Sequence, residues 1–180
     1  MRDETLTHYT ARLAVLVTAA ILFSFAMACG MPFAALGALA ALTMAPRDAT
    51  LLAGLGWFAN QAIGFGVLGY PLDATTIAWG GVLGLSALTG VGMALLALRV
   101  VSGAGLAVRL PLAFVAAWAG QQGIVVAAGA GLLASASATA PAVLWFMLWT
   151  NALAFAALLG VQWVGARAGL ARPVRSAVRA

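Results

Sequence analysis

Long apolar runs separated by short polar segments make up most of the chain. The runs cover residues 13–28, 33–44, 51–70, 75–98, 110–134 and 142–164. Because a membrane-spanning helix needs about 20 mainly apolar residues, five of these runs are long enough to cross a bilayer. The second run reaches only about 14 residues even when Pro32 and Ala45 are included, about two thirds of a hydrocarbon core. The pattern predicts an all-α membrane protein and leaves open whether the second run spans or re-enters.

The arginines decide between five and six spans. Short cytoplasmic connections of membrane proteins collect Arg and Lys, and the nine cationic residues here are all arginine. With six spans and a cytoplasmic amino terminus, every arginine lies on the cytoplasmic side of the membrane. If the second run only re-entered the membrane, Arg47, Arg99 and Arg109 would lie on the opposite side. We therefore predict a multi-pass protein of the bacterial cytoplasmic membrane. Residues 1–166 form one compact six-helix transmembrane bundle with both termini cytoplasmic, and residues 167–180 form a basic cytoplasmic tail at the anionic leaflet.

Composition and charge narrow the classes of function. A chain with 64% hydrophobic and 7% charged residues is not a soluble globule. The formal charge of +5 comes from arginines scattered between apolar runs, so no basic, aromatic-rich surface is available to bind nucleic acid. The single cysteine, Cys29, belongs to no metal-binding motif. Packing at a helix end is favoured for it over two alternatives, a soft copper or cobalt ligand and the end of a bacterial lipoprotein signal.

Glycine is abundant and regularly spaced. Lipid supplies no hydrophobic drive between helices, so small residues that let backbones approach closely stabilise membrane bundles. The 21 glycines therefore predict tight packing and say nothing about a substrate. Small and polar residues recur at i, i+4 in five places: Gly37 with Ala41, Gly56 with Asn60 and Gly64, Gly80 with Gly84, Ser86 with Gly90, and Gly123 with Ala127 and Gly131.

Ionisable residues are absent from all six predicted spans. The acids are Asp3, Glu4, Asp48 and Asp73, and the single histidine is His8. Intramembrane ionisable groups mark proton relays and ion pathways, and intramembrane proteases and metal carriers need histidine or carboxylate groups. This inventory predicts that the protein is not an enzyme and has no metal or cofactor. It leaves open only chemistry at the membrane surface by Asp48, Asp73 or His8.

Carboxamides and tryptophans are the polar side chains that the spans do contain. Buried amides cost about 1 to 3 kcal/mol each unless hydrogen-bonded, so they either join helices or bind a ligand in a cavity. Two W-x-x-[N/Q]-Q patterns, at 57–61 and 118–122, favour a cavity, because aromatic walls with a few polar groups are typical of small-molecule sites. The predicted hydrogen-bonding residues are Asn60, Gln61, Gln121, Gln122 and Asn151, with Trp57, Trp118, Trp145 and Trp149 as walls and Tyr70 at the mouth.

This layout resembles the substrate-binding S components of energy-coupling factor vitamin transporters. The resemblance covers the whole chain, but the family's Ala-x-x-x-Ala signature is missing from the first span, where Ala14 is followed four residues later by Thr18. It implies an outward-facing cavity for a vitamin or precursor, and a transmembrane scaffold subunit with ATPases as partners. In solitary members resembling a cobalamin carrier a cysteine can ligate cobalt, and Cys29 is the candidate that this resemblance implies.

Two functions follow as predictions. The first is a membrane-embedded substrate-binding or uptake protein for a small neutral polar or vitamin-like molecule, with cobalamin or a precursor among the candidates. A neutral ligand is expected because a charged one would need a counter-charge that the amides do not supply. The alternative is an accessory or assembly subunit of a membrane complex, in which every amide is used for packing. Membrane lipid surrounds the protein in both cases.

Overall fold

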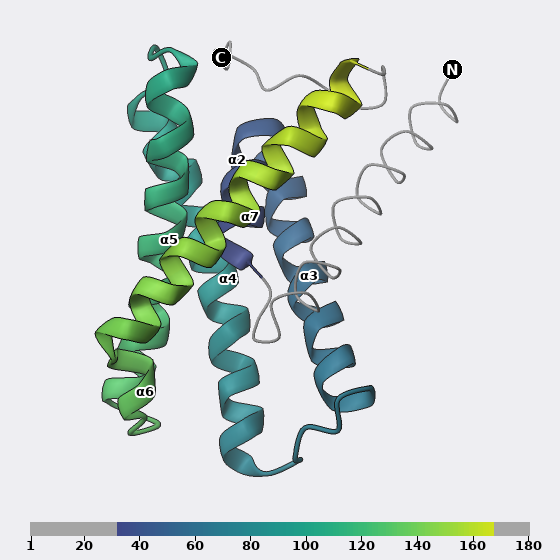
Figure 1. The fold of residues 1–180 in the computed structure, drawn as a ribbon, viewed down its shortest axis with the longest axis vertical. Helices are drawn as coiled ribbons and strands as arrows, with labels where there is room; N and C mark the ends of the chain where they lie inside the picture. Colours follow the sequence, from purple (N-terminus) through teal and green to yellow (C-terminus); the bar gives the residue numbers. More distant parts are fainter. Residues whose placement is uncertain (1–31, 168–180) are drawn as a thin grey trace.

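The computed structural model describes residues 32–167, a stretch that is helical and contains no strand. The helices are α2 (Phe33–Thr43), α3 (Pro46–Gly66), α4 (Ala74–Val100), α5 (Leu106–Ala130), α6 (Ala136–Thr139) and α7 (Pro141–Arg167) (Figure 1). The predicted all-α fold is confirmed over these residues. The first predicted span, His8, Cys29 and the basic tail after Arg167 lie outside the described residues.

Three of these helices, α4, α5 and α7, are long and apolar enough to cross a membrane. Helix α3 has 21 residues, which is a sufficient length. It is less apolar than the other three, however, because it contains Arg47 and Asp48 near its start and Asn60 and Gln61 towards its middle. By length and composition the described part of the chain is therefore that of a membrane protein with three long apolar helices.

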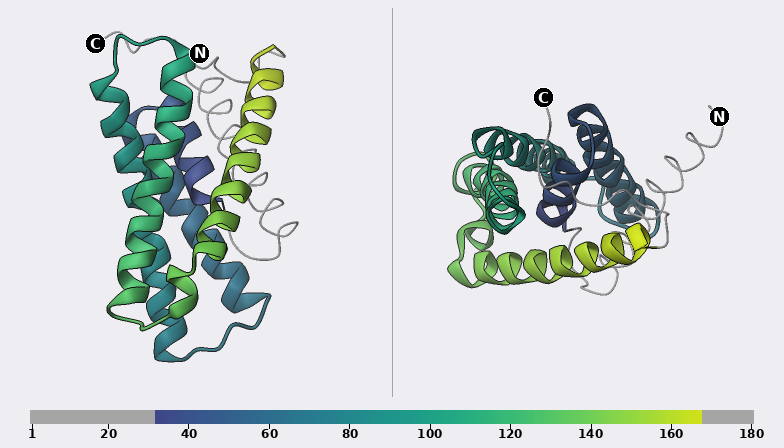
Figure 2. Two further views of the ribbon diagram at one scale, coloured as in Figure 1. Left: turned by 60° about the vertical axis from the view of Figure 1, so that its left-hand side comes forward. Right: turned by 90° about the horizontal axis from the view of Figure 1, so that it is seen from above.

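Helix α2 is a half-length helix inside the bundle. Its 11 residues extend about 16 Å, roughly half the thickness of a hydrocarbon core. It begins near the middle of the molecule, runs to one end (Figures 1 and 2), and contacts α3, α4, α5 and α7. Ten of its residues are buried, because the sequence FAALGALAALT has small or aliphatic side chains on every face. The short second apolar run is thus a central buried helix.

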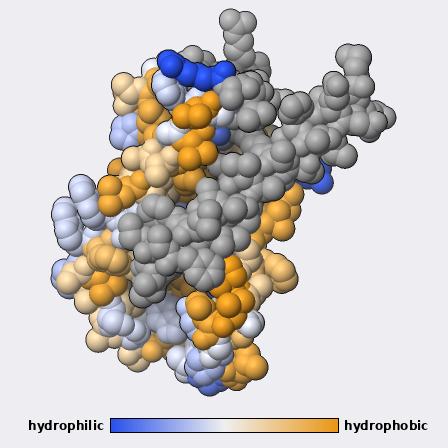
Figure 3. All heavy atoms as spheres, turned by 45° about the vertical axis from the view of Figure 1, so that its right-hand side comes forward, coloured by the Kyte–Doolittle hydropathy of each residue, from blue (hydrophilic) through white to orange (hydrophobic). Residues whose placement is uncertain are grey.

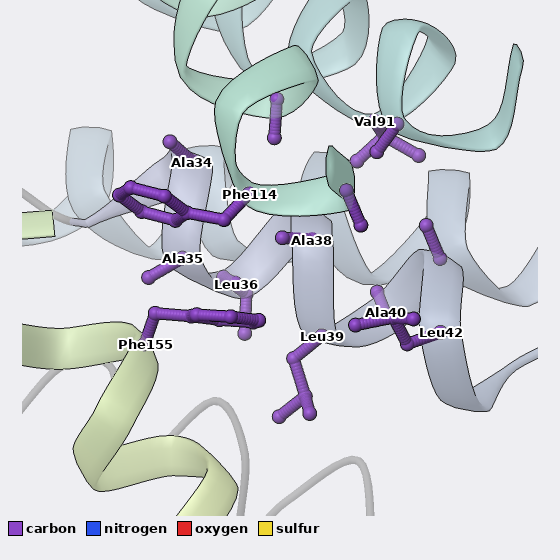
Figure 4. Close-up of a cluster of buried hydrophobic side chains, with 14 of the residues drawn as sticks. Ala34, Ala35, Leu36, Ala38, Leu39, Ala40, Leu42, Val91, Phe114 and Phe155 are labelled. Carbon is purple, nitrogen blue, oxygen red and sulfur yellow. The ribbon is translucent and has the colours of Figure 1, made fainter. Parts of the chain in front are cut away.

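The hydrophobic core forms around α2. Phe114 of α5 and Phe155 of α7 stack with their ring centroids 5.3 Å apart, and Figure 4 shows the two rings beside Ala34 and Ala35 of α2. Large apolar side chains also remain on the outside of the bundle, and Figure 3 shows extended apolar areas on the surface. A core of small residues with an apolar exterior is the arrangement expected for a bundle surrounded by lipid.

The connections alternate between the two ends of the bundle. The α2–α3 and α4–α5 connections and the carboxyl end of α7 lie at one end, and the α3–α4 connection and α6 lie at the other (Figure 1). The arginines of the described residues, Arg47, Arg99, Arg109 and Arg167, therefore all lie toward the same end. Arg167 there stacks on Trp163, with its guanidinium carbon 3.7 Å from the ring centroid.

Helices α4 and α5 pack through glycines. A Cβ atom at Gly90 of α4 would lie 2.9 Å from the carbonyl oxygen of Ala117, and one at Gly120 of α5 would lie 3.0 Å from that of Thr89. The two backbones thus approach as closely as the glycine spacing predicts. The structure also shows close contacts at Gly37, Gly80 and Gly84, whereas at Gly123 a Cβ would meet no other described residue within 4 Å.

We expect Gly90→Ala to destabilise the bundle by about 1–3 kcal/mol, because the added methyl group meets a backbone carbonyl that moves only with its helix. Gly92→Ala is the matched control in the same helix, since an added Cβ there would meet no other residue of positions 32–167 within 4 Å. Alanine is the better helix former, so the control should be neutral or slightly stabilised. Thermal unfolding in one detergent compares them, and equal melting temperatures would contradict the packing.

Asp73 caps the amino terminus of α4. Its carboxylate accepts hydrogen bonds from the Thr76 backbone N–H at 2.8 Å and from Thr76 Oγ1 at 3.1 Å. The backbone bond first, and then the hydroxyl bond, hold the pKa of Asp73 below its ordinary value, because both favour the ionised form. The sequence left Asp73 open for chemistry at the membrane surface, and the structure gives it a helix-capping role.

The cap predicts a pH dependence in the first turn of α4. A folded-state pKa below the unfolded value gives stabilisation that is complete above the unfolded value, about pH 4, and is lost as the pH falls through the folded pKa. We expect the protection of the first-turn amides in hydrogen exchange, corrected for intrinsic rates, to fall below about pH 4. Asp73→Asn keeps an acceptor without titrating, so this fall should be absent. The same profile in both proteins would refute the assignment.

Candidate functional site

Asn151 of α7 holds the amino-terminal end of α2. The residue before α2 is Pro32, which makes no side-chain capping bond. Asn151 Oδ1 instead accepts a hydrogen bond from the Ala35 backbone N–H at 3.3 Å, and Asn151 Nδ2 donates to the Met147 carbonyl oxygen at 2.9 Å. A buried helix end needs such an acceptor, because its first N–H groups have no partner within the helix. The side-chain oxygen and nitrogen of Asn151, which was predicted to bind a ligand, are therefore both hydrogen-bonded within the protein.

We expect Asn151→Leu to destabilise the protein by about 1–3 kcal/mol, because it leaves the buried N–H of Ala35 without an acceptor. Asn60→Leu makes the same chemical change at a half-buried position. There the Nδ2 group donates to the neighbouring Gln61 at 3.3 Å and to no other residue of the described part, so little loss should follow. Unfolding midpoints in the same detergent test this contrast, and a loss at Asn60 as large as that at Asn151 would count against the capping role.

The first W-x-x-N-Q pattern joins α3 to α4. Trp57 Nε1 donates a hydrogen bond to the Gly80 carbonyl oxygen at 2.8 Å. The same indole lies against Gly84, where a Cβ would be 2.8 Å from the ring, and the Gln61 amide lies against Gly80. Trp57 and Gln61 therefore fill the space that two glycines leave on α4. The structure gives this part of the predicted site a helix-packing role.

In the second pattern, on α5, two buried polar atoms lack such hydrogen bonds within the described residues. Gln121 and Gln122 are buried, with exposures of 6% and 7%. Within residues 32–167, Trp118 Nε1 and Gln121 Oε1 are buried and have no hydrogen-bond partner. The two residues are three apart, so their side chains are neighbours on one helix face. Each unsatisfied buried atom costs about 1–3 kcal/mol, so this pair requires an explanation.

The pair is linked to α2 through two successive residues of α4. Gly90 of α4 faces the Cβ of Gln121, and the next residue, Val91, faces Gly37 of α2. Gly37 is only two residues, about 3 Å along the helix, from Ala35, the residue bonded to Asn151. We call Trp118, Gln121 and Gln122 of α5 the central polar site.

The remaining predicted residues lie elsewhere. Tyr70 follows α3, with its ring against Gly64 and edge-on to Phe65 at a centroid distance of 6.2 Å. Trp145 and Trp149 lie on the outer face of α7, with exposures of 67% and 59%. The structure thus places Trp118, Gln121 and Gln122 next to one another on α5, and it bonds Asn151 of α7 to the start of α2. It does not bring Tyr70, Trp145 or Trp149 to them.

Arg109 is a buried residue that the sequence analysis placed in a connection. It is the fourth residue of α5 and is only 1% exposed, which corrects the expectation that no arginine lies within a long apolar helix. Buried charges are costly unless they are paired and mark sites worth testing. The apolar run begins at Leu110 in the prediction, whereas the helix begins at Leu106, directly after Gly105. A helix start after this glycine would have placed Arg109 in the first turn of α5.

Comparison of the chain with protein-family models, with curated proteins and with solved structures gave no match. Within the described residues there is also no group of three or more His, Cys, Asp or Glu that could hold a metal ion. The central polar site is therefore the feature from which a function can be argued.

Proposed function

We propose that the protein is a membrane-embedded substrate-binding or uptake protein for a small, neutral, polar or vitamin-like molecule. The observation that carries this proposal is the unsatisfied pair Trp118 Nε1 and Gln121 Oε1. The equivalent indole of Trp57 and the amide of Asn151 both have partners. A buried donor and acceptor without partners are best accounted for by a ligand that supplies the missing bonds.

The surroundings favour a neutral ligand. Arg109 is twelve residues before Gln121 in α5, which corresponds to about 18 Å along the helix. The other ionisable side chains of the described part, such as Asp73 and Arg99, lie at or near helix ends. A charged ligand at the central polar site would therefore lack a nearby counter-charge, which makes its desolvation costly.

The half-length α2 supports transport as the purpose of binding. Helices that end at mid-depth, with their amino-terminal N–H groups directed at a bound molecule, are a recurring feature of membrane transporters. On this proposal the arginine-bearing end of the bundle faces the bacterial cytoplasm and the ligand enters from the opposite side. A transmembrane scaffold subunit with ATPases, as the resemblance to energy-coupling factor S components implies, would then drive its release.

An accessory subunit is the second candidate, and specific contacts favour it. Trp57, Gln61 and Asn151 all serve packing, as this candidate requires. The exposed aromatic side chains Trp145 and Trp149 on α7 offer a surface for another membrane subunit. This candidate leaves the buried pair on α5 unexplained, so we rank it second.

The two candidates differ in what Gln121→Leu should do. If Gln121 binds a ligand, this change removes an unsatisfied acceptor, so the protein should be as stable as wild type or up to about 2 kcal/mol more stable, yet retain no ligand. Native mass spectrometry with an absorbance spectrum, on protein purified in mild detergent, tests for a co-purified molecule. Gln61→Leu, at the α3–α4 contact, is the matched control that should keep the ligand.

Two results would argue against the binding proposal. One is a wild-type protein that carries no small molecule after growth in vitamin-replete medium. The other is a Gln121→Leu protein that retains the molecule at the wild-type level. A loss of stability in Gln121→Leu without any ligand in the wild type would favour the accessory subunit.

A further inference from the structure

The unsatisfied atoms at the central polar site define a donor and an acceptor. The indole N–H of Trp118 can only donate a hydrogen bond, and Oε1 of Gln121 can only accept one. Both atoms are buried, and within the described residues neither has a partner. From this pair, and resting on the proposed function, we infer the chemical class of the ligand: a neutral amide-type edge, as in a carboxamide, lactam or cyclic urea, attached to an apolar ring.

The chemistry of the pair selects this edge. A ligand that satisfies both atoms needs a carbonyl oxygen to accept from Trp118 and an N–H group to donate to Gln121. The two side chains are one helical turn apart, with Cβ atoms about 5–6 Å from each other, so the two ligand groups must be close together. An amide carries both groups on adjacent atoms. An alcohol would have to accept from Trp118 and donate to Gln121 through a single oxygen, whereas an amide meets each atom with a separate group. A carboxylate or an ester has no donor.

The nearby backbone agrees with a carbonyl group. The contacts of Gly90 with Gln121 and of Val91 with Gly37 link the pair to α2 through α4. The first N–H groups of a helix attract a partial negative charge. Asn151 occupies one of them, the N–H of Ala35. The side chain that holds α2 in place is thus itself an amide, which shows that an amide oxygen fits against this helix end.

The walls of the site are apolar. Phe114 of α5 and Phe155 of α7 are buried next to the first turn of α2, and Ala117, the residue before Trp118, is also buried. Aromatic and aliphatic surfaces of this kind favour the body of a ring over a chain of polar groups. Because Trp118 Nε1 and Gln121 Oε1 are enclosed, a ligand reaches them only after neighbouring side chains or α7 move. Binding should therefore be slow and should protect α7 from hydrogen exchange.

Three small probes with the same aromatic ring test this inference. Benzamide has the carbonyl and the N–H groups, N,N-dimethylbenzamide lacks the N–H, and benzoate is charged. Binding to wild-type protein in lipid nanodiscs is measured by calorimetry, with empty nanodiscs to subtract partitioning into lipid. We expect the dissociation constant of benzamide to be at least tenfold lower than those of the other two. Gln121→Leu and Trp118→Phe should each abolish this preference, and Gln61→Leu should keep it.

The outcomes separate this inference from the proposed function. Equal binding of benzamide and N,N-dimethylbenzamide, or tighter binding of benzoate, overturns the amide class. So does a co-purified molecule that has no amide-type group, although the proposed binding function then stands. If none of the probes binds and no molecule co-purifies, both proposals fail. If the preference for benzamide persists in Gln121→Leu, the amide group of benzamide binds somewhere other than Gln121. This result also overturns the inference.

Discussion

The buried amino-terminal end of α2 is the constraint on which the rest of the bundle depends. A helix of 11 residues is too short to be stable by itself. The amino-terminal end of α2 also lies in the interior of the bundle, where its first N–H groups need acceptors. Small side chains on every face let four other helices pack around it. Asn151, which is 116 residues away in sequence, supplies an acceptor. The position of α7 is therefore tied to the end of α2 by a specific bond as well as by apolar packing.

The two W-x-x-[N/Q]-Q patterns show how the facing helix decides the role of a side chain. Opposite Trp57 and Gln61, α4 presents Gly80 and Gly84, whose missing side chains expose a carbonyl oxygen and make room for the indole. On α5, Trp118 and Gln121 find no such acceptor or donor within the described residues. The same sequence pattern thus forms a packing contact in one helix and an unsatisfied pair in the other. Trp57 and Trp118 are the same residue at the same position of the pattern, and only the surface that faces each indole differs.

Periodicity and composition were sufficient to predict the helices and their order. Apolar runs identified α3, α4, α5 and α7 within a few residues, since helix length and hydropathy are local properties. The depth at which α2 begins was not predictable, because it depends on which helices surround it. For the same reason the sequence identified Asn151 as a polar residue of interest but not its bond to Ala35. Arg109 was missed because the apolar run begins at the next residue, Leu110. The arginine was therefore assigned to the connection that precedes the helix.

The unsatisfied pair also bears on the choice between a ligand and a protein partner. Two buried atoms at about 1–3 kcal/mol each cost a large part of the 5–15 kcal/mol typical of a folded domain. Leucine or phenylalanine at these positions would remove that cost, so Gln121 and Trp118 are not explained by stability of the bundle. A protein subunit docking on the exposed Trp145 and Trp149 face leaves enclosed atoms unchanged. A small molecule that enters the bundle can bond to both, which is why the buried pair favours a binding function.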